Sequence, residues 1–170
     1  MEYRKIEPSQ IAENPFEMLN KEWALLTAQH EGKINTMTVS WGTMGVLWRK
    51  NIVQVFIRPQ RYTKEFVDSE ERFTLSFYGE DRKKELTHLG RVSGRDENKI
   101  EIVGFTPRMF GAAPAFEEAR LVLVCKKLYA QPIDPKCFLP GNTCEEENYP
   151  LKDYHTMYVG EIEEVYQRTL

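Results

Sequence analysis

Two stretches of this chain decide how the rest is interpreted: Asn35-Thr36-Met37-Thr38-Val39-Ser40-Trp41-Gly42 and Ile57-Arg58-Pro59-Gln60-Arg61-Tyr62-Thr63. The first alternates like a β-strand, although it is rich in hydroxyl and amide side chains. The second carries a pair of arginines and a pair of hydroxyls just before a predicted helix. Together they suit a ligand that has a flat polar ring at one end and a phosphate at the other.

The composition is that of an ordinary globular protein, with 170 residues, 41% hydrophobic and 29% charged, and a net charge of −3. The length is typical of one domain, here residues 1–170, with a substantial core. The charge balance offers no basic field for nucleic acid, and no apolar run reaches the roughly 20 residues that cross a bilayer. The first residues lack the apolar core of a signal peptide, so we expect a cytoplasmic location without membrane attachment.

Hydrophobic periodicity predicts a mainly β chain with a few short helices. The predicted strands cover residues 23–28, 34–41, 52–57, 73–78, 99–105, 120–129 and 157–166. The predicted helices cover residues 14–21, 63–68 and 81–89, with Asn14 and Thr63 as N-caps and a turn at Glu31-Gly32. Closely spaced strands with so few helices favour an antiparallel barrel or sandwich.

The second stretch has the donors that a phosphate needs. Arg58 and Arg61 offer planar guanidinium forks, and Tyr62 and Thr63 add hydroxyls. Thr63 also opens a predicted helix, whose first free N–H groups favour an anion. The alternative is a solvated turn at the end of a strand, with both arginines in surface salt bridges.

The first stretch presents two different faces if it is a strand. Thr36, Thr38 and Ser40 share one face, and Asn35, Met37, Val39 and Trp41 share the other. A face of hydroxyls suits the floor of a ligand site, while backbone groups of residues 38–42 could bind the polar edge of a ring. Met37, Trp41 or Trp48 could cover its apolar edge. The alternative is a half-exposed strand whose polar face lies in water.

These residues carry a family likeness that continues along the chain. Further matching motifs are Gly45–Trp48, Phe73–Phe77, Ser93–Asp96 with Lys99, Glu118–Leu121, Lys126–Tyr129 and His155–Ile162. In this order, over about residues 14–166, the chain resembles the flavin reductase-like family, and within it the flavoredoxin branch. The resemblance implies an FMN-binding antiparallel split β-barrel and a homodimer with flavin mononucleotide (FMN) near the subunit interface.

The resemblance also implies roles for individual residues. Asn35–Trp41 would line the flavin, Arg58–Thr63 would take the phosphate and ribityl chain, and Lys99 and His155 would lie close to the flavin. The predicted cofactor-binding residues are Asn35, Met37, Thr38, Val39, Ser40, Trp41, Arg58, Gln60, Arg61, Tyr62, Thr63 and Lys99. The family's small residues after the Trp-Gly pair are here Thr43-Met44, and residues 138–150 resemble a variable loop that takes no assigned role.

The resemblance implies an NAD(P)H-dependent flavin or FMN reductase acting in electron transfer, with NADH or NADPH as donor. The alternative is a non-enzymatic electron carrier that is reduced by a redox protein, since no separate nicotinamide motif is visible. His155 could polarise a carbonyl group, bind a nicotinamide phosphate or only pack. A more distant alternative is a split barrel that binds haem through His155.

The remaining histidines and the cysteines indicate no further chemistry. His30 and His88 are expected to be structural or to face solvent. Cys125 lies in an apolar run and is expected to be buried. Cys137 and Cys144 match no common zinc spacing, so no metal is expected, and a disulfide between them is open in principle.

Overall fold

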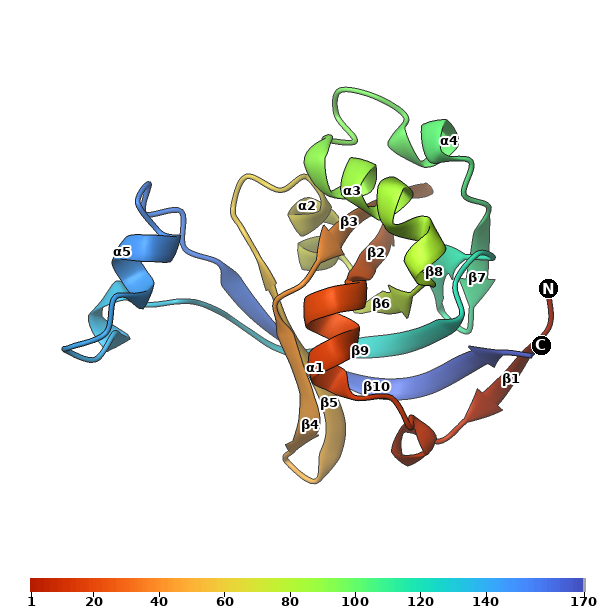
Figure 1. The fold of residues 1–170 in the computed structure, drawn as a ribbon, viewed down its shortest axis with the longest axis horizontal. Helices are drawn as coiled ribbons and strands as arrows, with labels where there is room; N and C mark the ends of the chain where they lie inside the picture. Colours follow the sequence, from red (N-terminus) through yellow and green to blue (C-terminus); the bar gives the residue numbers. More distant parts are fainter. Residues whose placement is uncertain (170) are drawn as a thin grey trace.

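The computed structural model describes residues 1–169, and most of its strands form one antiparallel sheet (Figure 1). The strand order is β3-β2-β6-β9-β10-β5-β4, with β1 paired to β10. The strands are β1 (Tyr3–Ile6), β2 (Ala24–His30), β3 (Lys33–Val39), β4 (Gly42–Leu47), β5 (Lys50–Ile57), β6 (Arg72–Phe77), β9 (Leu121–Pro132) and β10 (Thr156–Arg168). A separate hairpin joins β7 (Pro107–Phe110) to β8 (Ala113–Phe116).

The helices are short and lie between the strands. They are α1 (Pro15–Glu17), continued by a π-helical turn (Met18–Glu22), then α2 (Thr63–Ser69), α3 (Lys83–Arg91), α4 (Lys99–Val103) and α5 (Cys144–Asn148). Single 3-10 turns cover Pro8–Gln10, Glu80–Arg82 and Pro135–Cys137. Both α2 and α3 pack against β3, but from opposite faces of the sheet, because their buried residues belong to different cores.

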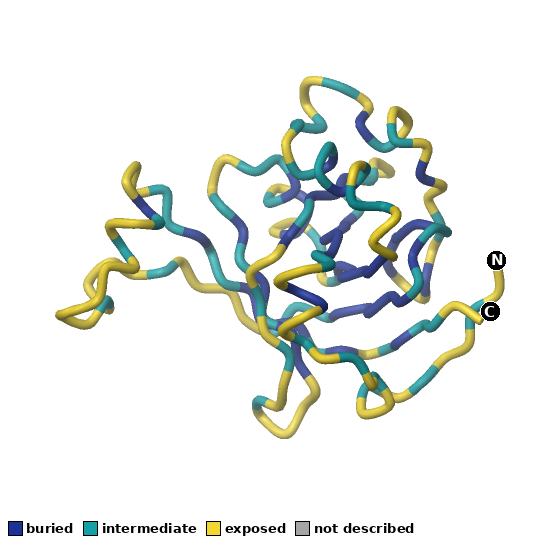
Figure 2. The backbone as a smooth tube through the Cα atoms, in the orientation of Figure 1, coloured by how far each residue is buried: buried dark blue, intermediate teal, exposed yellow. Residues whose placement is uncertain are grey.

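Each face of the sheet buries its own hydrophobic core, as the two-residue period of a strand requires. On β9, Leu121 and Leu123 enter one core, whereas Val122 and Val124 enter the other. The first core also receives Phe66 of α2. Figure 2 shows the buried residues concentrated in the central strands, so the cores lie at the middle of the sheet.

Two segments project from this body (Figure 1). One is the tip of the β4–β5 hairpin, and the other, here called the arm, comprises residues 133–155 between β9 and β10. Figure 2 shows that both are largely exposed. Leu139 and Leu151 on the arm are 76% and 84% exposed, and Val46 on the hairpin is 73% exposed. Such apolar exposure on projecting segments is typical of surfaces that contact another molecule.

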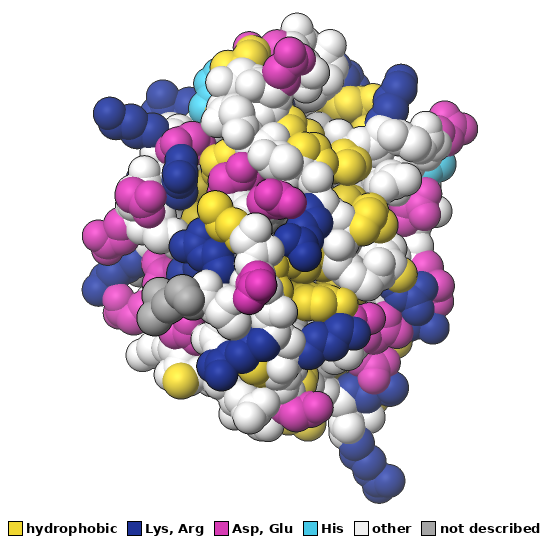
Figure 3. Space-filling view, turned by 90° about the vertical axis from the view of Figure 1, so that its right-hand side faces the viewer, with side chains coloured by type: hydrophobic (Ala, Val, Ile, Leu, Met, Phe, Trp, Pro, Cys, Tyr) yellow, Lys and Arg dark blue, Asp and Glu magenta, His cyan; other side chains and the backbone are white. Residues whose placement is uncertain are grey.

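The face that carries the chain termini, β7 and β8 mixes charges of both signs (Figure 3). Lys5 pairs with Glu164 at 2.6 Å, and Arg108 approaches Glu117 at 3.8 Å. This face therefore presents no extended field of one sign. Among residues 1–169, no helix has both the length and the hydropathy to span a membrane.

Most of the predicted elements are confirmed, with shifts at their ends. Asn14 caps α1 by accepting a hydrogen bond from the backbone N–H of Phe16. Glu31 and Gly32 form the predicted turn between β2 and β3, with φ values of 48° and 75°. Both positive angles suit the tight turn that joins twisted antiparallel strands.

The strand predicted over residues 99–105 is wrong, because Lys99–Val103 forms α4. The alternating isoleucines of this segment fit a strand, but Ile100 and Val103 pack on the second core while Ile102 is 58% exposed. Gly104 then ends the helix in the left-handed conformation, at φ 70°. The prediction also missed β1, β4, β7 and β8.

Gly160 on β10 lies where a side chain has no room. An added Cβ would lie 2.8 Å from Cζ of Phe73 and 3.1 Å from Cβ of Cys125, both of which are buried. We expect Gly160→Ala to lower the free energy of unfolding by about 1–3 kcal/mol, the usual cost of overpacking a core. Urea unfolding measures it. Gly45→Ala on the edge strand is the control, because nothing lies within 4 Å of its added Cβ; equal losses in both variants would contradict the expectation.

Candidate functional site

The structure brings every sequence-predicted site residue to the lining of one cleft, made of two adjoining pockets that share Met37. The first pocket, of about 110 Å³, is called the phosphate end after the expectation above, and is lined by Asn35, Met37, Gln60, Arg61, Tyr62, Thr63, Arg91, Val92, Ser93 and Lys99. The second pocket, of about 280 Å³, is called the ring end for the same reason, and is lined by Met37, Thr38, Val39, Ser40, Trp41, Phe56, Arg58 and His155.

The cleft forms where several element ends meet. The last residues of β3 lie between α2 and α3, and the chain leaves β5 at Ile57 to begin α2 at Thr63. His155 comes immediately before β10, whose first residue, Thr156, pairs with Ile57. The antiparallel pairing therefore sets His155 beside the start of the phosphate stretch, although the two are far apart in the sequence.

The expected hydroxyl floor does not form, because two of its three hydroxyls bind within the protein. Thr36 is fully buried, and its Oγ1 lies 2.8 Å from Oγ1 of Thr27. The Thr38 hydroxyl donates to the carbonyl oxygen of Leu86 on α3 at 2.5 Å. Ser40 remains exposed. The hydroxyls of Thr36 and Thr38 thus attach β3 to its neighbours rather than facing a ligand.

Asn35, on the other face of β3, organises the phosphate end. Its amide Nδ2 donates to Oγ1 of Thr63 at 3.0 Å. Thr63 is the first residue of α2 and not its N-cap, which is Tyr62, so the capping prediction is wrong by one position. Because the Thr63 oxygen accepts from Asn35, its own proton stays available for a ligand. The Arg95 guanidinium lies 4.3 Å above the ring of Tyr62, which lines this end.

Two cations, the buried Lys99 and the half-buried Arg61, lie at the C-terminal end of α3. Nζ of Lys99 donates to the carbonyl oxygens of Leu89 and Val92, both at 2.8 Å, and Nη2 of Arg61 donates to that of Gly90 at 2.7 Å. A helix C-terminus carries partial negative charge, so these cations neutralise it. Burial, reinforced by the charge of Arg61, lowers the pKa of Lys99 to about 8. Burial likewise lowers the pKa of Arg61.

Arg58 and Gln60 turn toward the arm. Nη1 of Arg58 lies 2.6 Å from a carboxylate oxygen of Asp153, and Nε2 of Gln60 donates to the same oxygen at 2.9 Å. Arg58 also donates to the carbonyl oxygen of Asn148 at 2.9 Å. We call these contacts the clasp, because they fasten the arm to the connection between β5 and α2.

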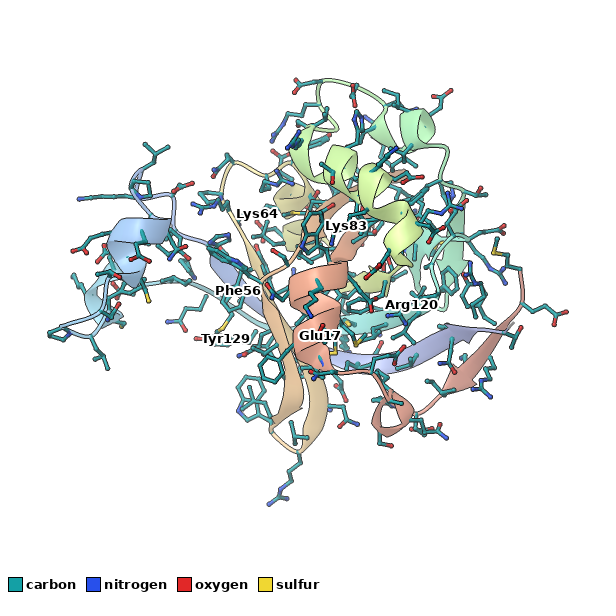
Figure 4. The ribbon with its side chains drawn as sticks, in the orientation of Figure 1. Glu17, Phe56, Lys64, Lys83, Arg120 and Tyr129 are labelled. Carbon is teal, nitrogen blue, oxygen red and sulfur yellow. The ribbon has the colours of Figure 1, made fainter. Side chains whose placement is uncertain are left out.

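His155 lies at the ring end between aromatic side chains. Its ring centroid is 5.1 Å from that of Trp41 and 6.5 Å from that of Phe56, which Figure 4 shows beside the start of the arm. Its Nδ1 lies 2.9 Å from the hydroxyl of Tyr149. Burial lowers the pKa of His155 to about 4, with Arg58 adding to the shift and Asp153 opposing it. The imidazole is therefore neutral at pH 7.

Sequence reasoning missed several residues of the cleft. Ser93 belongs to the family motif Ser93–Asp96, and Phe56 directly precedes the stretch Ile57–Thr63. Their closeness to these motifs could have identified them as residues of the cleft. Asp153 and Tyr149 lie in or beside the segment interpreted as a variable loop, and nothing in the sequence pointed to their contacts.

The histidines away from the cleft pair with glutamates, and none of the cysteines that the structure describes forms a disulfide. His30 pairs with Glu70, and His88 pairs with Glu97. Cys125 is buried as predicted, whereas Cys137 and Cys144 are exposed and free. Within residues 1–169, no three His, Cys, Asp or Glu side chains gather as metal ligands.

The low pKa of His155 can be tested without any ligand. We expect its NMR signals to titrate near pH 4 rather than at the 6.5 of an ordinary histidine. Because the unfolded chain binds this proton more tightly, the free energy of unfolding should fall as the pH drops from 6.5 to 4. The signals that disappear in His155→Asn belong to His155. The same variant should show a weaker pH dependence of the free energy of unfolding. A midpoint near 6.5 would contradict the burial argument.

Comparisons with known proteins identify the family and the fold. The family model described as flavin reductase like domain matches residues 18–169. The FMN-binding domain of a flavin reductases-like enzyme from Shewanella baltica superposes with a TM-score of 0.71 at 15% identity, over 98% of this chain and 77% of that one. Flavoredoxin from Methanosarcina acetivorans superposes with a TM-score of 0.66 at 23% identity, over 86% and 68% of the two chains.

A protein from Shewanella frigidimarina that is described as having a split barrel domain superposes with a TM-score of 0.69 at 21% identity, over 96% of this chain and 75% of that one. Because the two chains share a fold, the fold of this protein is a split β-barrel. No curated protein sequence matches. Because the family model spans nearly the whole chain, this protein belongs to the flavin reductase-like family.

Proposed function

We propose that this protein binds FMN in the cleft and acts as an NAD(P)H-dependent flavin or FMN reductase in electron transfer. The observation that carries the proposal is the convergence of cationic and hydroxyl donors at one end of the cleft and aromatic side chains at the other. Solved structures of the same fold include proteins described as FMN-binding, a flavin reductase named PheA2 and the flavin reductase of a styrene monooxygenase.

The phosphate end fits a dianion. Arg61 uses one nitrogen for Gly90 and keeps its remaining N–H groups for a ligand. The hydroxyls of Thr63 and Ser93 and the ammonium group of Lys99 line the same pocket. Arg58 and Gln60 contribute less here than the sequence suggested, because the clasp occupies them. We infer that Arg61, Thr63 and Lys99 hold the phosphate.

The ring end fits a flat ring system. Trp41 and Phe56 supply apolar walls, the backbone of residues 38–41 supplies hydrogen-bonding groups, and His155 supplies a neutral nitrogen. Bound FMN would provide the hydride and electron chemistry. The residues of this chain would orient the ring, exclude water from its apolar edge and offer a hydrogen-bond donor to it.

A homodimer is also proposed, with the cleft near its interface. The projecting arm and the β4–β5 hairpin expose large apolar side chains, including Trp48 at 56% and Leu151 at 84%. β4 is an edge strand with an unpaired side. Edges and apolar projections of this kind are usually covered in stable proteins. Trp41, which is 47% exposed, lines the cleft and would then lie close to the partner subunit.

Replacing Arg61 tests the phosphate assignment. We expect Arg61→Ala to weaken FMN binding by about 1.5–3 kcal/mol, the usual scale for hydrogen bonds to charged groups. Binding of riboflavin, which lacks the phosphate, should change little. Flavin fluorescence titration measures both affinities. Arg82→Ala removes an exposed arginine near the other end of α3 and serves as the control. An equal loss for both flavins would contradict the assignment.

Anaerobic reduction separates the reductase from the electron carrier. We expect FMN-loaded protein to bleach rapidly when mixed with NADH or NADPH in a stopped-flow spectrometer. Slow bleaching by both nucleotides, together with fast reduction by an iron–sulfur protein, would instead assign the carrier role. A colourless protein that cannot be reconstituted with FMN would contradict both functions.

A further inference from the structure

A buried polar pair lies at the base of the arm. The Tyr149 hydroxyl and Nδ1 of His155 are 2.9 Å apart, and the two residues are only 6% and 8% exposed. The nearby arm residues Leu139 and Leu151, by contrast, are 76% and 84% exposed. Burying two polar groups away from the core is costly unless they are paired, so their placement is a specific feature of this segment.

The clasp holds both members of this pair. Arg58 reaches the carbonyl oxygen of Asn148, directly before Tyr149, and its guanidinium lies 5.3 Å above the Tyr149 ring. Asp153, two residues before His155, is fixed by Arg58 and Gln60. The arm therefore cannot shift at Tyr149 without breaking contacts with the connection between β5 and α2.

The hydrogen-bonding groups of the pair decide where the proton lies. His155 is neutral, so one ring nitrogen carries a proton and the other accepts one. Burial raises the pKa of Tyr149, which keeps its hydroxyl protonated. Within residues 1–169, Nδ1 of His155 is the one acceptor for that hydroxyl. A proton on Nδ1 would leave the tyrosine proton without a partner, so the tyrosine donates and Nε2 of His155 carries the proton.

The other ring nitrogen of His155, Nε2, is exposed rather than buried. It has no hydrogen-bond partner within residues 1–169, whereas every buried side-chain nitrogen and oxygen of those residues has one. Nε2 is therefore reached by solvent, and His155 lines the ring end together with Trp41 and Phe56. A neutral N–H group between aromatic walls suits an uncharged acceptor, such as a carbonyl oxygen, better than an anion.

We propose that Tyr149 is a positioning residue that fixes His155 as a donor, through Nε2–H, to the carbonyl oxygen of a planar ligand in the ring end. The inference rests on the proposed function, because it concerns what the flavin site contacts. The carbonyl belongs either to the flavin ring or to a planar amide that stacks on it, and the hydrogen bond has the same chemistry in both.

Nitrogen NMR of His155 tests the proposal on the wild-type protein. We expect a single neutral tautomer with the proton on Nε2. FMN is added first, then nicotinamide, with 3-methylpyridine as the matched ring that lacks a carbonyl. A shift of the Nε2–H signal on adding FMN identifies the flavin carbonyl; a shift only with nicotinamide identifies the second ligand. A proton on Nδ1, or no shift with either ligand, overturns the proposal.

Tyr149→Phe keeps the ring and removes the hydroxyl. We expect the single tautomer to be lost, and the preference for the carbonyl ligand over a ring without it to fall about fivefold, as for the loss of one ordinary hydrogen bond. Tyr154→Phe is the control, because its hydroxyl donates to Glu145 on the arm. An unchanged tautomer and preference in Tyr149→Phe overturn the positioning role.

These outcomes separate the inference from the proposed function. If FMN does not bind, the proposed function fails. The inference fails with it if nicotinamide also leaves the Nε2–H signal of the unliganded protein unmoved, or if the proton lies on Nδ1. If FMN binds with its usual affinity to Tyr149→Phe but the tautomer is unchanged, the inference alone fails.

Discussion

The pairing of β5 with β10 is the constraint on which the candidate site depends. In this antiparallel register Thr156 lies opposite Ile57, and Met157 lies opposite Phe56. His155 and Arg58, one residue beyond that first pair, are therefore neighbours at the end of the sheet. The same strand, β10, also pairs with β9, so both ends of the arm leave the sheet beside the cleft. A slip of one residue would turn every side chain of the strand to the other face and separate these groups.

The two arginines of the basic stretch, Arg58 and Arg61, have different electrostatic partners. Arg61 lies against the carbonyl end of α3 together with Lys99, where cations offset the negative end of a helix. Arg58 is held by Asp153 on the arm. Each cation thus has a protein partner, which holds it in place at the cleft and limits the cost of burying it. The phosphate end and the arm both contact the short connection between β5 and α2, through Arg61 and through Arg58 with Gln60.

Period-two hydrophobicity predicted the central strands well, because both faces of the sheet bury apolar side chains. It failed at residues 99–105, where Ile100 and Val103 lie on one face of a helical turn, and where Gly104 and the contacts of Lys99 favour α4. It missed β4, because Gly42–Leu47 includes two glycines and is an edge strand held by β5 alone. Local patterns do not record such long-range hydrogen bonds.

The sequence by itself determined the strand-rich class, the family likeness and most of the residues that line the cleft. The tertiary structure decided which of those residues face a ligand. The hydroxyls of Thr36 and Thr38 form hydrogen bonds within the protein. Arg58 forms an ion pair with Asp153 on the arm, and Tyr149 is hydrogen-bonded to His155. The physical reason is that a side chain's partner depends on strand register and on segments distant in the sequence, whereas a motif specifies only which groups are available.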